Sequence, residues 1–116
     1  MYIFVYGTLK RNHGAYRLHK EMTEYVGEAT ADGSMWSCGA FPAVTFSGEG
    51  KVKGEVFKVL EEDVVPILDR YEGVPFLYIK LFTKVTLESG EEVVALAYEY
   101  AKDTSNLEKV ESGVWL

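Results

Sequence analysis

Residues 2–9 have the sequence Tyr-Ile-Phe-Val-Tyr-Gly-Thr-Leu, in which five apolar or aromatic side chains are followed abruptly by a glycine. An uninterrupted run of β-branched and aromatic residues is typical of a buried strand. Gly7 then predicts that this strand runs into a turn formed by residues 7–9. Such a turn presents consecutive backbone N–H groups, which can bind an anion without a basic side chain. An ordinary strand-to-loop turn is the alternative interpretation.

Two short helices are predicted. Apolar residues at positions 15, 18 and 22 have helical spacing and indicate an amphipathic helix over 15–22. A second stripe (Val64, Leu68, Tyr71) indicates a helix within 60–72, with Glu62 or Asp63 as its N-cap. Gly73 is expected to end this helix in a left-handed conformation.

The rest of the chain has the pattern of strands. Residues 25–59 contain short strand-like pieces separated by Gly and Pro, and residues 45–46 are predicted to pair with residues 52–59 across the turn at 48–50. Residues 78–87 and 93–100 are predicted to form a hairpin, and the tail at 101–116 ends in apolar residues that could fold back. Strands with two interspersed helices predict an α+β domain.

The chain of 116 residues has the size of one domain, so we expect a single domain over 1–116. Its longest apolar runs are far shorter than a membrane helix requires, and no secretory signal is visible. A single cysteine, Cys38, suits a reducing cytoplasm and is more simply interpreted as a small core residue than as a nucleophile. We therefore expect a cytoplasmic protein with no membrane partner.

The formal charge of −6 and the absence of a basic stripe make nucleic acid and anionic membranes poor candidate partners. His13, His19 and Cys38 lack the spacing of a zinc site, and no phosphate-binding loop is present, so neither a metal nor a cofactor is expected. A small anionic substrate would then have to be bound by backbone amides.

Glu72 is the most distinctive candidate for acid–base chemistry. It is expected at the carboxyl end of the second helix, where the helix dipole disfavours a carboxylate, and its sequence neighbours are largely apolar. Both effects raise the pKa of a carboxyl group towards neutrality, which suits a general acid and base. A solvated glutamate with an ordinary pKa is the alternative.

Four segments together resemble the gamma-glutamylcyclotransferase-like family. They are Phe-Val-Tyr-Gly-Thr-Leu-Lys (4–10), Gly-Ala-Phe-Pro-Ala-Val (39–44), Gly-Glu-Val-Phe (54–57) and Leu-Asp-Arg-Tyr-Glu-Gly (68–73), the last followed by Tyr78. The resemblance is strongest to the small gamma-glutamylamine cyclotransferase branch. It implies a mixed-sheet β-barrel flanked by two short helices, and an enzyme that releases 5-oxoproline from a small γ-glutamyl amide.

The resemblance also assigns roles to residues. Glu72 matches the family's acid–base glutamate, and Tyr6, Gly7, Thr8 and Leu9 match the loop whose amides hold the substrate's α-carboxylate. Tyr78 matches a tyrosine that lines the pocket, with a hydroxyl expected to donate to the substrate or to Glu72. Lys80 stands where the family often has arginine, which keeps the charge but not a bidentate contact. A non-catalytic module that binds a small molecule in the same pocket is the competing hypothesis.

Overall fold

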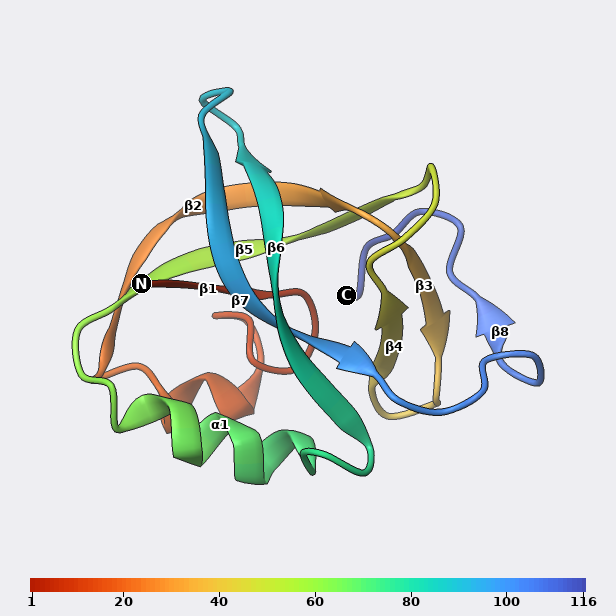
Figure 1. Ribbon diagram of the computed structural model, residues 1–116, viewed down its shortest axis with the longest axis horizontal. Coiled ribbons are helices and arrows are strands. Elements are labelled where there is room, and N and C mark those ends of the chain that lie inside the picture. The colour runs from red at the N-terminus through yellow and green to blue at the C-terminus, as the bar shows by residue number, and fades with distance from the viewer.

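Strand β1 (Tyr2–Val5) lies between β5 and β7 in a closed five-stranded barrel of order β1-β5-β2-β6-β7, in a computed structural model that describes all 116 residues (Figure 1). Neighbouring strands are antiparallel, except that β1 and β7 pair in parallel and close the barrel. The other barrel strands are β2 (Thr23–Asp32), β5 (Lys51–Val59), β6 (Tyr78–Leu87) and β7 (Glu92–Tyr100).

A second, three-stranded sheet lies beside the barrel (Figure 1). Its order is β4-β3-β8, and its strands are β3 (Ser34–Ser37), β4 (Pro42–Thr45) and β8 (Glu108–Lys109). The chain passes from β2 into β3 at Gly33, where a β-carbon would lie 2.4 Å from the Thr45 carbonyl oxygen. Only glycine permits so close an approach of two backbones.

Along β1 and the residue directly after it, alternate residues belong to two different core clusters, as the twofold period of extended backbone requires. Phe4 and Tyr6 pack in a cluster that the second sheet shares, through Met35 and Val44. Ile3 and Val5 pack in the other cluster, which buries one face of the single α-helix. That helix, α1 (Val64–Glu72), lies along one side of the barrel together with a 3₁₀-helix, η1 (Gly14–Leu18) (Figure 1).

The expected architecture, a mixed-sheet barrel with short helices, is confirmed. The first strand and the hairpin formed by β6 and β7 lie where the sequence predicts them, and Asp63 is the N-cap of α1. Gly73 ends the helix with a left-handed φ of 67°. The tail does fold back: β8 pairs with β3, and Trp115 packs against the first core cluster.

The helix predicted over 15–22 is a 3₁₀-helix instead, and it covers only Gly14–Leu18. Its hydrogen bonds mostly span three residues, as from the Tyr16 amide to the His13 carbonyl and from the His19 amide to the Tyr16 carbonyl. So short a segment has little helical cooperativity of its own, and a 3₁₀ turn satisfies the backbone where the chain must soon enter β2. The predicted apolar stripe still packs against the second core cluster.

The predicted pairing of residues 45–46 with 52–59 is wrong. Both edges of β5 are taken, one by β1 and the other by β2, so β5 has no edge left for the residues that precede it. Strand β4 pairs with β3 across a turn at Gly39, which has a φ of 94°. The two segments are close in sequence, but they belong to different sheets.

The longest helix of the structure, α1, has nine residues. No helix is long and apolar enough to cross a membrane.

Candidate active site

A cavity of about 230 Å³ opens where β1 ends and faces the carboxyl end of α1. It brings together all six residues singled out from the sequence: Tyr6, Gly7, Thr8, Leu9, Glu72 and Tyr78. Its other lining residues were not predicted as site residues; they are Phe4, Val5, Phe41, Pro42, Tyr71, Leu77 and Tyr98. The wall is therefore mostly apolar and aromatic, and Glu72 is its only carboxyl group.

Glu72 lies in this cavity because it continues the buried stripe of its helix. Val64 and Leu68 are fully buried, and Glu72 follows at the same spacing of four residues, so its side chain projects from the same face. It forms neither an ion pair nor a side-chain hydrogen bond, and burial raises its pKa from 4.5 to about 7. The raised pKa predicted from the sequence is thus confirmed, with loss of solvent as its cause.

The turn after β1 leaves three successive backbone amides without a protein partner. The Lys10 amide donates to the Gly7 carbonyl oxygen at 3.1 Å and closes the turn. The amides of Gly7, Thr8 and Leu9 have no protein acceptor. The Thr8 hydroxyl lies 2.8 Å from the Tyr71 hydroxyl, which joins the turn to α1. Free consecutive N–H groups of this kind are where an acidic protein can hold a carboxylate.

Three tyrosines of the wall have their hydroxyl protons committed to protein acceptors. Tyr6 donates to the Tyr98 carbonyl oxygen at 2.5 Å, and the Tyr98 hydroxyl donates to Asp69 at 2.8 Å. Tyr78 donates to the Pro42 carbonyl oxygen at 2.5 Å, and not to Glu72, which was one of the two acceptors expected, the other being the substrate. Pro42 is the first residue of β4, and because its carbonyl oxygen accepts the hydroxyl proton, Tyr78 presents only its lone pairs and ring to the cavity.

The tyrosines also stay protonated. Burial raises the pKa of Tyr78, and the Glu72 charge adds to this effect. Burial also raises the pKa of Tyr98, and its hydrogen bond to Asp69 and the charges of Asp69 and Glu72 raise it further. Among the wall groups whose pKa is shifted, Glu72 is the one whose pKa lies near neutrality.

Lys80 does not line the cavity; its amine donates to Asp69 at 2.7 Å. Asp69 thus holds Lys80 with one oxygen and the Tyr98 hydroxyl with the other. The positive charge at position 80 is therefore linked to the cavity wall only indirectly, through Asp69 and its hydrogen bond with Tyr98. Cys38 is partly buried and lies outside the cavity lining, and no group of three or more His, Cys, Asp or Glu side chains could hold a metal ion.

The fold and cavity define a small α+β barrel protein with one partly buried carboxyl group opposite a turn of free amides. Residues 3–116 match the family model described as gamma-glutamyl cyclotransferase, AIG2-like, and the chain belongs to this family.

Individual relatives agree with this assignment. The protein named "Putative gamma-glutamylcyclotransferase MJ1514" from Methanocaldococcus jannaschii is 28% identical over 114 residues, which cover 97% of this chain and 92% of that protein. The crystal structure of an AIG2-like protein from Mus musculus matches with a TM-score of 0.78 and 27% identity, over 96% of this chain and 86% of that one. YkqA from Bacillus subtilis matches with a TM-score of 0.79 and 29% identity over 98% of this chain, which spans only 39% of YkqA.

Proposed function

We propose that the protein is a γ-glutamyl cyclotransferase that releases 5-oxoproline from a small γ-glutamyl amide. One observation carries the proposal: a carboxyl group with a pKa of about 7 shares a cavity with three free backbone amides. The amides suit the α-carboxylate of a glutamyl group, and the carboxyl group suits a proton transfer at neutral pH. Membership of the gamma-glutamyl cyclotransferase family supports the same reaction.

In this reaction the substrate supplies its own nucleophile. Ionised Glu72 takes a proton from the α-ammonium group, and the resulting amine attacks the γ-carbonyl carbon. Glu72 returns that proton to the amide nitrogen, the bond between carbon and that nitrogen breaks, and an amine leaves. The ring nitrogen loses its second proton to solvent through Glu72, and 5-oxoproline remains.

The cavity favours ring closure by holding both ends of a flexible molecule. The turn at residues 7–9 would hold the carboxylate end, and the aromatic wall would fold the aliphatic chain so that amine and carbonyl meet. Orientation of this kind contributes several kcal/mol to intramolecular reactions. A volume of about 230 Å³ suits a glutamyl group rather than a long peptide.

The test is a panel of γ-glutamyl amides, including γ-glutamyl-ε-lysine, γ-glutamyl alkylamines and glutathione, with 5-oxoproline measured by chromatography. We expect time-dependent release of 5-oxoproline from at least one of them. Binding of 5-oxoproline in calorimetry without turnover of any amide would instead favour the non-catalytic binding module. If the protein neither turns over any amide nor binds 5-oxoproline, the proposed function is wrong.

A further inference from the structure

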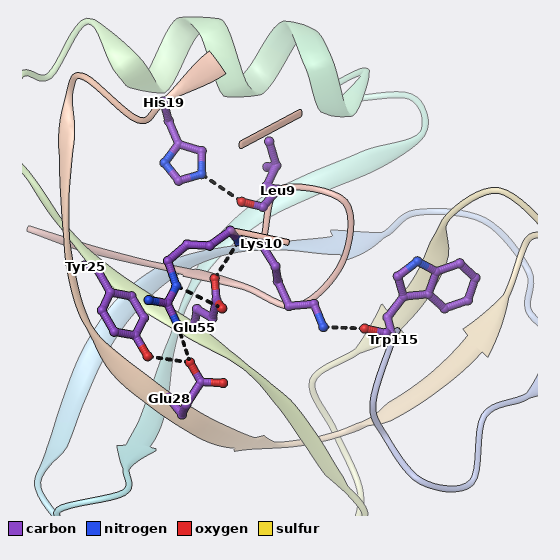
Figure 2. A network of polar contacts seen from close by, with 8 residues as sticks. Leu9, Lys10, His19, Tyr25, Glu28, Glu55 and Trp115 are labelled. Atoms are coloured by element: carbon purple, nitrogen blue, oxygen red, sulfur yellow. Dashed lines mark hydrogen bonds and ion pairs between the residues drawn. The ribbon is translucent and has the colours of Figure 1, made fainter. Parts of the chain in front are cut away.

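The last residue with a free amide and the two residues after it are each held by a distant part of the chain (Figure 2). The Leu9 carbonyl oxygen lies 2.9 Å from Nε2 of His19. The Lys10 amine donates to the Trp115 carbonyl oxygen, and the Arg11 amide donates to Glu55 Oε1 at 2.9 Å. The turn is therefore hydrogen-bonded to three separate parts of the chain: the residue directly after η1, the C-terminal tail and β5.

The bond from His19 to Leu9 is the most deeply buried of the three, because His19 has no exposed surface. A carbonyl oxygen only accepts, so Nε2 of His19 must carry the proton that the bond needs. Nδ1 is then an acceptor, and the Thr23 hydroxyl is the donor that lies between two acceptors, Nδ1 at 2.8 Å and the His19 carbonyl oxygen at 2.9 Å. Burial lowers the pKa of His19, which favours a neutral ring with its single proton on Nε2.

This bond fixes the orientation of one peptide group in the turn. The group that joins Leu9 to Lys10 has its oxygen held by His19 and its N–H held by the Gly7 carbonyl, at 2.9 and 3.1 Å. A planar peptide held at both ends cannot rotate without breaking one of the two bonds. The Gly7 carbonyl that accepts from Lys10 belongs to the same peptide group as the Thr8 amide, so the two bonds connect the anchored peptide group to one that carries a free amide.

We propose that His19 is a positioning residue for the substrate's carboxylate, acting through the Leu9 carbonyl to keep the free amides of the turn aimed into the cavity. The inference rests on the proposed function, in which those amides bind the carboxylate. His19 does not line the cavity and takes no proton from the substrate. Its contribution is preorganisation, which raises affinity by lowering the cost of ordering the site on binding.

A purely structural role makes a different prediction. The His19 ring packs edge-on against the rings of Phe57 and Tyr16, with centroid distances of 4.8 and 5.1 Å. A phenyl ring could keep both contacts. If packing is all that matters, His19→Phe should preserve binding. If the N–H donor matters, it should not.

The experiment compares three variants by the affinity of 5-oxoproline in calorimetry. In His19→Gln the amide nitrogen occupies the place of Nε2, whereas in His19→Asn it reaches only the place of Nδ1, and His19→Phe has no donor. We expect wild-type affinity in the Gln variant and a loss of about tenfold or more in the other two, as for one lost hydrogen bond to a buried carbonyl. Val85→Ala, a cavity-forming change in the other core cluster and outside the cavity lining, is the control for lost stability alone.

Amide hydrogen exchange of Lys10 provides a second measurement that needs no ligand. We expect faster exchange of this amide in His19→Asn and His19→Phe than in wild type, and protection in His19→Gln and Val85→Ala. Equal affinity and equal exchange in all three His19 variants, or the same losses in Val85→Ala, would overturn the inference. If wild type neither binds 5-oxoproline nor turns over any amide, the proposed function fails, while the exchange comparison still reports whether His19 holds the turn.

Discussion

Gly7 lies so close to the ring of Pro42 that a β-carbon on residue 7 would be 2.7 Å from the Pro42 Cγ and 2.9 Å from its Cδ. The residue that carries the first free amide of the turn thus lies directly beside the first residue of β4, in the second sheet. Gly7 is required here for close approach and not for an unusual backbone angle, because its φ is not positive. The relationship joins the barrel to the second sheet at the edge of the cavity.

Gly7→Ala is expected to displace the turn and weaken the binding of 5-oxoproline. Neither Pro42 nor the buried turn can yield the missing few tenths of an ångström without a backbone shift, so we expect a loss of about tenfold in affinity, measured by calorimetry. Gly14→Ala is the matched control, because a β-carbon there meets nothing within 4 Å. Equal affinities in the two variants would contradict the role of the Gly7 contact.

Glu72→Gln is expected to lower kcat by at least about two orders of magnitude, since general acid–base groups contribute about 10²–10⁴ in rate. The amide keeps the shape of the side chain but cannot take the ammonium proton, so 5-oxoproline should still bind. Glu62→Gln, on an exposed residue just before the same helix, is the control and should keep wild-type turnover. A Glu72→Gln enzyme with near-normal kcat would remove Glu72 from the proton transfer.

The pH profile of kcat/KM should rise with an apparent pKa of about 7. Glu72 is active in its ionised form, and burial holds its pKa at about 7, so activity is lost as the pH falls through that value. The measurement is the initial rate of 5-oxoproline release between pH 5 and pH 9. An acidic limb near the ordinary glutamate value of 4.5 would show that the working carboxyl group is not the buried one.

The same burial makes Glu72 a source of instability at high pH. A carboxyl group whose folded pKa exceeds its unfolded pKa binds more protons in the folded state between pH 4.5 and about 7, so stability falls as the pH rises through that window. Glu72→Gln should therefore increase the free energy of unfolding above pH 7 by about 1–3 kcal/mol, and Tm should rise with it. At pH 4.5 the increase should be smaller. Thermal unfolding at the two pH values checks this, and a Tm gain that is the same at both would contradict it.

Local patterns in the sequence predict the parts of the site that depend on one segment. The break at Gly7 predicts the turn, and the position of Glu72 at the end of an amphipathic helix predicts its raised pKa. The resemblance to a family brings these two features together, which neither pattern does alone. Their shared cavity is then a consequence of how the second core cluster packs α1 against β1.

The missed residues depend on contacts between distant segments. Tyr98 is one apolar residue among many in β7, and only the parallel pairing of β1 with β7 places its carbonyl beside Tyr6. His19 has no distinctive spacing in the sequence, because its partner Leu9 is defined by the course of the turn. For the same reason the predicted pairing of residues 45–46 with β5 was wrong. It rested on closeness in sequence, but β1 and β2, which are more distant in sequence, occupy both edges of β5.

The parallel closure of the barrel also bears on synthesis of the chain. The Tyr6 hydroxyl needs the carbonyl of a residue 92 positions later, so the wall of the cavity is incomplete until β7 has docked against β1. A nascent polypeptide that has left the ribosome only as far as β6 already contains Gly7, Glu72 and Tyr78, yet it has no finished pocket. Ligand recognition thus begins only after most of translation is over, and truncation before β7 would yield a fragment unable to bind.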